Sequence, residues 1–144
     1  EKCRDLLTPT GVMLLHTIGR ADGPNFTDAF TDKYIFPGGY IPSLSEVIRA
    51  NDHLRWFVSD VEVLRLHYAY TLKAWYDRTV AAREAIVALY DERFFRMWTF
   101  YLAGACVSFA HGPLVNYQIQ FCRDRDALPL TRDYMFEGER RFSA

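Results

Sequence analysis

The sequence predicts an α/β fold that corresponds to the C-terminal half of a doubly wound sheet. Strand patterns occur at 12–18, 57–66 and 114–121, and helical segments separate them. The first of these is a nearly unbroken apolar run, which is typical of strands covered on both faces in a parallel sheet. It follows a helix end and a turn. We therefore expect earlier strand–helix units upstream of this chain.

The N-terminal third alternates short helices with turns. Residues 1–7 resemble the last turns of a helix, and Pro9 and Gly11 break it before the first strand. Residues 20–33 are polar and predict a loop with a short helix. Prolines and glycines in "YIFPGGYIP" then exclude a regular helix.

A further helix start is marked by "SLSE". Ser43 or Ser45 can cap it, and Glu46 stands three residues after Ser43, as in a capping box. This helix is expected to end near Asn51.

The C-terminal half predicts two helices and a strand. Residues 69–88 have loosely helical apolar spacing. In 90–110 the apolar residues recur every three or four positions and form one stripe. Residues 114–121 alternate apolar and polar side chains, which favours a half-exposed edge strand. We divide the chain into a main part, 1–122, and a charged tail, 123–144.

Composition excludes several classes of protein. The 144 residues are 50% hydrophobic and 16% aromatic, with a formal net charge of -1. One domain of this size can bury a core, and the charge balance gives no sign of nucleic-acid binding. The three separated cysteines predict free thiols and a reducing compartment. No apolar run is long enough for a transmembrane helix, no signal peptide is evident, and the histidines lack metal-ligand spacing.

Two polar side chains stand out at the expected strand ends. His16 is placed at the end of the first strand and Tyr68 just past the second. Ligands of open α/β sheets bind beyond the carboxyl ends of strands, so the pair would face one crevice if the strands were neighbours. An imidazole and a phenol suit a small oxygen-rich anion or a proton transfer. The plainer interpretation is a hydrogen-bonded structural histidine and a core tyrosine. The stripe at 90–110 is likewise core in its plainer interpretation.

Several stretches together resemble one known family. They are "LLHTIG", "DKYIFPGGYIPSLSEV", "DVEVLRLHYAYTLKAWYDR", "LYDERFFRMWTFYLAG" and "YQIQFCRDRDALPLTRDY", in this order. The set resembles the C-terminal half of cyclopropane-fatty-acyl-phospholipid synthases and mycolic acid cyclopropane synthases, from about residue 3 to residue 135.

The resemblance implies an S-adenosylmethionine-dependent methyltransferase with a seven-stranded doubly wound sheet. In such enzymes an acyl-chain alkene attacks the sulfonium methyl group. The resulting carbocation loses a proton and closes to a cyclopropane. Some relatives leave a methyl branch, a methylene or a hydroxyl instead.

The resemblance also implies roles for particular residues. His16, the backbone of Ile18 and Tyr68 match ligands of a bicarbonate that takes the proton, with His16 and Tyr68 as catalytic residues. Phe36, Leu72 and Tyr101 match residues that line the acyl pocket. Aromatic faces suit a carbocation, which must also be kept dry.

Residues for the methyl donor are absent from these 144 residues, because the family's cofactor loop lies upstream. We therefore expect the chain alone to be inactive. Its expected partners are an unsaturated acyl lipid, a membrane surface met transiently and a second copy in a homodimer, with a cytoplasmic location at the membrane periphery. Two alternatives stay open: a methyl-branching lipid methyltransferase, or a truncated non-catalytic module for lipid binding or dimerisation.

Overall fold

A three-stranded antiparallel sheet forms the centre of the chain, which the computed structural model describes over residues 2–143. The spatial order is β1-β3-β2. Both outer strands run antiparallel to β3 and are therefore parallel to each other. The strands are β1 (Val12–Arg20), β2 (Phe57–Val63) and β3 (Leu114–Cys122).

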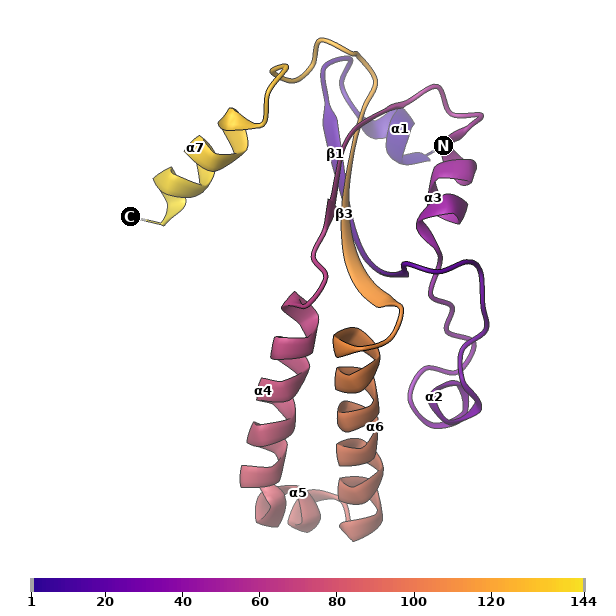
Figure 1. The fold of residues 1–144 in the computed structure, drawn as a ribbon, viewed down its shortest axis with the longest axis vertical. Helices are drawn as coiled ribbons and strands as arrows, with labels where there is room; N and C mark the ends of the chain where they lie inside the picture. The colour runs from indigo at the N-terminus through magenta and orange to yellow at the C-terminus, as the bar shows by residue number, and fades with distance from the viewer. Residues whose placement is uncertain (1, 144) are drawn as a thin grey trace.

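Seven helices surround or extend this sheet in the described part of the chain. Figure 1 shows α4 and α6 side by side beyond one end of the sheet, with α5 joining them at the far end. In chain order the helices are α1 (Lys2–Leu6), α2 (Ala29–Tyr34), α3 (Leu44–Asn51), α4 (His67–Ala81), α5 (Arg83–Leu89), α6 (Glu92–Ala110) and α7 (Asp133–Phe142).

One face of the sheet is packed against the short N-terminal helices. Its core holds Trp56 and alternate residues of β3, including the fully buried Ile119. Leu44 and Val47 of α3 pack against this core. The helix starts where the sequence predicts, because Ser43 and Glu46 form the expected capping box. We call this the packed face.

The opposite face of the sheet is largely open. It carries Leu14 and His16 of β1 beside Gln118 and Gln120 of β3. The expectation that the first strand is covered on both faces is therefore wrong for the described residues. Leu14 is 57% exposed, because only every second residue of β1 meets the packed face.

The predicted positions of two strands also need correction. The strand at 114–121 lies in the middle of the sheet, not at its edge. Its alternation of polar and apolar residues reflects the difference between the two faces. The first strand continues to Arg20, so His16 lies within it, four residues before its end.

The helices of the C-terminal half agree better with expectation. The segment expected as one helix at 69–88 is divided into α4 and α5, and α6 covers most of 90–110. In the tail, α7 buries no residue and projects away from the sheet (Figure 1). Arg132 and Tyr134 link the tail to Asp60 and Gln120.

Candidate functional site

An apolar cluster fills the space between α4, α6 and the end of β1. Its buried members are Ala69, Leu72, Leu102 and Phe109, and we call it the α4–α6 cluster. Three residues that sequence analysis assigns to the site, Ile18, Tyr68 and Tyr101, pack against it, and the fourth, Leu72, is fully buried in it. Segments far apart in the sequence thus bring four candidate residues together.

Helix α6 begins at a side-chain cap and contributes a line of buried residues to the core. Asp91 caps the helix by accepting a hydrogen bond from the backbone N–H of Phe94 at 2.6 Å. Phe95, Leu102 and Phe109 recur every seven residues and form the buried line of the helix. The expected stripe is partly right, because Trp98, Tyr101 and Ala105 contact the cluster, whereas Tyr90 is 61% exposed.

Tyr68 lies in the first turn of α4, half-buried among aromatic rings. Its ring meets Phe109 edge-on with centroids 4.9 Å apart, and it meets Trp75 at 5.8 Å. Burial raises the pKa of the Tyr101 phenol, and the neighbouring Tyr68 adds to the rise. The Tyr101 phenol therefore keeps its proton at neutral pH.

Phe36 reaches the same place from the loop after α2. Its ring contacts that of Tyr101 edge-to-face, with centroids 6.1 Å apart and planes at 79°. This geometry is a preferred arrangement of aromatic pairs. The three residues assigned to the acyl pocket, Phe36, Leu72 and Tyr101, are thus joined through Tyr101.

The described contacts of His16 do not include Tyr68. His16 lies on the open face of β1, and its Nδ1 is 3.3 Å from Nε2 of Gln118 on β3. The condition under which His16 and Tyr68 would face one crevice, that their strands are neighbours, is not met, because β3 lies between β1 and β2. However, β1 and β2 are parallel, so Ile18 and Tyr68 are still delivered to the same end of the sheet.

The backbone of Ile18 points away from the sheet. Two residues further on, the N–H of Arg20 donates to the carbonyl of Pro42 across the outer edge of β1, at 3.0 Å. Backbone groups two residues apart in a strand point the same way, so the N–H of Ile18 also faces this edge. No described strand pairs with it there. The Ile18 carbonyl accepts from the Thr17 hydroxyl at 2.8 Å.

Asn116 is a polar residue of this region that sequence analysis did not single out. It is 6% exposed, and its Oδ1 is buried without a hydrogen-bond partner in the described residues. It stands directly opposite Ile18 on β3 and on the same face. The only sequence signal was a polar residue in an alternating strand, which predicts exposure rather than burial.

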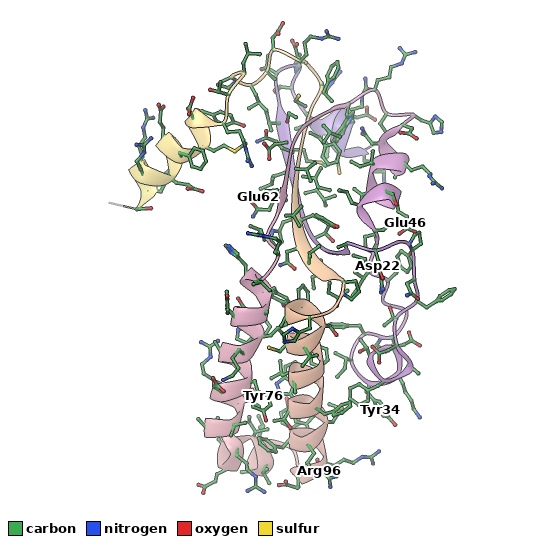
Figure 2. The ribbon with its side chains drawn as sticks, in the orientation of Figure 1. Asp22, Tyr34, Glu46, Glu62, Tyr76 and Arg96 are labelled. Carbon is green, nitrogen blue, oxygen red and sulfur yellow. The ribbon has the colours of Figure 1, made fainter. Side chains whose placement is uncertain are left out.

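An open groove of about 780 Å³ borders α6 and is also lined by one residue each of α2 and α4. Phe30, Met97 and Phe100 contribute apolar walls. Figure 2 labels Tyr76 on α4 and Arg96 near the start of α6, which also line this groove. None of the site residues that the family resemblance implies lines this groove.

Neither a metal cluster nor a spanning helix is found among residues 2–143. No three His, Cys, Asp or Glu side chains there gather as metal ligands would. No helix of this part combines the length and hydropathy needed to cross a bilayer.

Two solved cyclopropane synthases have a similar arrangement of elements. The cyclopropane synthase MmaA2 from Mycobacterium tuberculosis superposes with a TM-score of 0.76 at 26% identity, over 83% of this chain and 46% of that one. The mycolic acid cyclopropane synthase CmaA1, complexed with SAH and CTAB, gives 0.70 at 30% identity, over 77% and 44%. The chain thus shares the α/β fold of these cyclopropane synthases.

The family follows from the sequence comparison. The family described as "Mycolic acid cyclopropane synthetase" matches residues 1–119. The chain is 36% identical over 117 residues to a cyclopropane-fatty-acyl-phospholipid synthase of Escherichia coli, which is 81% of this chain and 30% of that protein. The chain therefore belongs to the mycolic acid cyclopropane synthetase family.

Other relatives carry out different lipid methylations. A tuberculostearic acid methyltransferase of Mycobacterium tuberculosis is 39% identical over 100 residues, covering 68% of this chain and 23% of the relative. A sphingolipid C9-methyltransferase of Candida albicans is 29% identical over 128 residues, covering 85% and 25%. The chain spans between about a quarter and a third of the length of these curated relatives.

Proposed function

We propose that this chain is the acyl-pocket part of an S-adenosylmethionine-dependent methyltransferase that converts the double bond of an unsaturated acyl chain into a cyclopropane. The observation that carries the proposal is the meeting of Ile18, Tyr68, Leu72 and Tyr101 at the α4–α6 cluster, with Phe36 against Tyr101. These residues come from four separate segments, and the family resemblance implies a site role for each.

The aromatic wall is suited to a positive charge on the acyl chain. Phe36 and Tyr101 offer ring faces and edges, and the fully buried Leu72 belongs to the cluster against which Tyr101 packs. A carbocation is stabilised by such faces, and an apolar wall keeps out the water that would capture it. When bound, S-adenosylmethionine supplies the methyl group, and we assign no residue of this chain to holding it.

In this proposal a small anion, the bicarbonate that the family resemblance implies, binds beside this wall. The N–H of Ile18 faces the unpaired edge of β1, and the hydroxyl of Tyr68 lies at the same end of the sheet. His16 lies on the same face as Ile18, about 7 Å along the strand. In this proposal bicarbonate accepts the proton that the new methyl group loses.

The fold supports a larger sheet. The outer edge of β1 lacks a partner strand in the described residues, and its open face carries the exposed Leu14. Unpaired backbone groups and exposed apolar side chains are what further strands and helices would cover. We therefore propose that β1–β3 are the C-terminal strands of a seven-stranded doubly wound sheet, and that this chain alone is inactive.

Formation of a methyl branch is the second candidate. It is favoured by the tuberculostearic acid and sphingolipid methyltransferases among the relatives. The cation is the same, and the product depends on where the proton is lost. The division into 1–122 and 123–144, the homodimer, transient membrane contact and the cytoplasmic location stay predictions from the sequence.

The test is expression of the complete reading frame that contains these residues, in a host without cyclopropane lipids. We expect unsaturated acyl chains to gain the mass of one methylene, with NMR separating a ring from a methyl branch. Tyr68→Phe should lower the rate while the protein stays folded, because it removes one hydroxyl from an aromatic cluster. Lipids of unchanged mass in cells that contain the folded wild-type protein would contradict the proposal.

A further inference from the structure

The position of Phe36 depends on a tight turn rather than on burial. The carbonyl of Phe36 accepts from the N–H of Gly39 at 2.9 Å, Pro37 follows Phe36, and Gly38 has φ of +73°. Proline followed by a glycine with positive φ is the signature of a type II turn. Phe36 itself is 56% exposed. Packing in the described residues therefore covers less than half of Phe36.

Two side chains from outside the turn bind its backbone. Oδ1 of Asp32, on α2, accepts a hydrogen bond from the N–H of Gly38 at 2.9 Å. The hydroxyl of Thr27 donates to the carbonyl of Gly39 at 2.6 Å. Together they hold both glycines of the turn, one through its donor and the other through its acceptor.

The same segment contacts α6 at two neighbouring positions. Phe30 on α2 meets Phe100 edge-on with centroids 4.9 Å apart, and Phe36 meets Tyr101 at 6.1 Å. Phe100 and Tyr101 are consecutive on the helix, so the segment crosses α6 at one level. The hydrogen bond between Asp32 and Gly38 links the turn that follows Phe36 to the helix that carries Phe30. It therefore limits the distance between Phe36 and Phe30.

We propose that Asp32 and Thr27 are positioning residues that hold Phe36 against Tyr101 and thereby set the shape of the acyl-binding wall. The proposal rests on the proposed function, because it gives these two residues a part in recognising the acyl chain. Neither side chain needs to contact the substrate. Asp32 acts through the backbone of Gly38, and Thr27 acts through that of Gly39.

The test uses the complete protein and steady-state kinetics with acyl lipid and with S-adenosylmethionine. Asp32→Ala and Thr27→Val remove the tethers, whereas Asp32→Asn and Thr27→Ser keep an acceptor or a hydroxyl. Loss of one such hydrogen bond should raise KM for the acyl lipid about fivefold and leave KM for S-adenosylmethionine unchanged. The conservative variants should restore most of the loss. Lys33→Ala, next to Asp32 and exposed, serves as the surface control and should match wild type.

A double-mutant comparison separates positioning from general stability. In a Phe36→Leu background, Asp32→Ala should add little, because the ring that it positions is gone. Additive losses, or equal losses toward both substrates, would overturn the proposal and indicate a purely structural role. If the folded wild-type protein modifies no acyl lipid, the proposed function fails instead. If wild type is active and Asp32→Ala equals it, only this inference fails.

Discussion

The two faces of the sheet differ in how much of their surface is buried. The packed face buries Ile119, Phe121 and Tyr117 under α3, whereas the open face exposes Leu14 and carries His16, Gln118 and Gln120. Both faces include apolar side chains, yet only one has a cover in the described residues. An apolar strand sequence therefore indicates that surface must be buried, but it does not identify the element that covers it.

The largest expected effect is on the packed face. Ile119→Ala should lower the free energy of unfolding by about 3 kcal/mol, because it opens a cavity at a fully buried position. Gln118→Ala, one residue away on the open face, should cost less than about 1 kcal/mol. Urea denaturation of both variants measures the difference. Equal losses would show that the open face is covered as tightly as the packed one.

Gly19 tests how closely the packed face fits. A Cβ added there would clash with the ring of Tyr117 and press on the carbonyl of Pro42. Gly19→Ala should therefore cost about 2 kcal/mol through overpacking. Gly23→Ala is the matched control, because nothing lies near its added Cβ. Thermal melting of the two variants should separate them, and a Gly19→Ala protein as stable as the control would be inconsistent with this close contact.

Asn116 is the buried exception on the open face. Its unpartnered Oδ1 loses hydration without gaining a hydrogen bond. Asn116→Leu should therefore raise the free energy of unfolding by about 1 kcal/mol, and Asn116→Asp, which buries a charge, should lower it. If Asn116→Leu is instead destabilising in the complete protein, the amide has a partner there that lies outside the described residues.

The smallest effect concerns the helix that covers the packed face. Hydrogen bonds from the Tyr40 hydroxyl and the Ser43 backbone hold the pKa of Glu46 below its ordinary value of 4.5. The stability that this carboxylate contributes is present above that value and is lost as the pH falls through the lower folded-state pKa. Unfolding curves of wild type and Glu46→Gln should converge as the medium becomes acidic. A constant gap at all pH values would argue against the cap.

Local sequence signals predicted the individual helices and strands better than they predicted which strands lie side by side. The capping box at Ser43, the strands and the helix over 92–110 follow from residues close together in the sequence. The position of β3 between β1 and β2 does not, because antiparallel pairing depends on contacts across many residues. The alternation in 114–121 correctly indicates two unlike faces, but a central strand with one open face has the same pattern as an edge strand.

In the candidate site, too, some residues could be predicted from the sequence and others could not. Tyr68, Leu72 and Tyr101 were found through the family resemblance, and the structure places them in or against one cluster. Asn116 and the tethers of the Phe36 turn gave no signal. An orphan buried oxygen and a side-chain hydrogen bond to a distant backbone are properties of folded coordinates, not of residue type.

The outer edge of β1 has a practical consequence. There the N–H of Ile18 and the backbone groups of alternate residues face outward with no described strand to receive them, beside the exposed Leu14. Such an edge is a template on which another extended chain can pair. These residues produced in isolation should be sparingly soluble and form fibrous aggregates on storage. Purification should succeed only when additional sequence, or a designed blocking strand, shields that border.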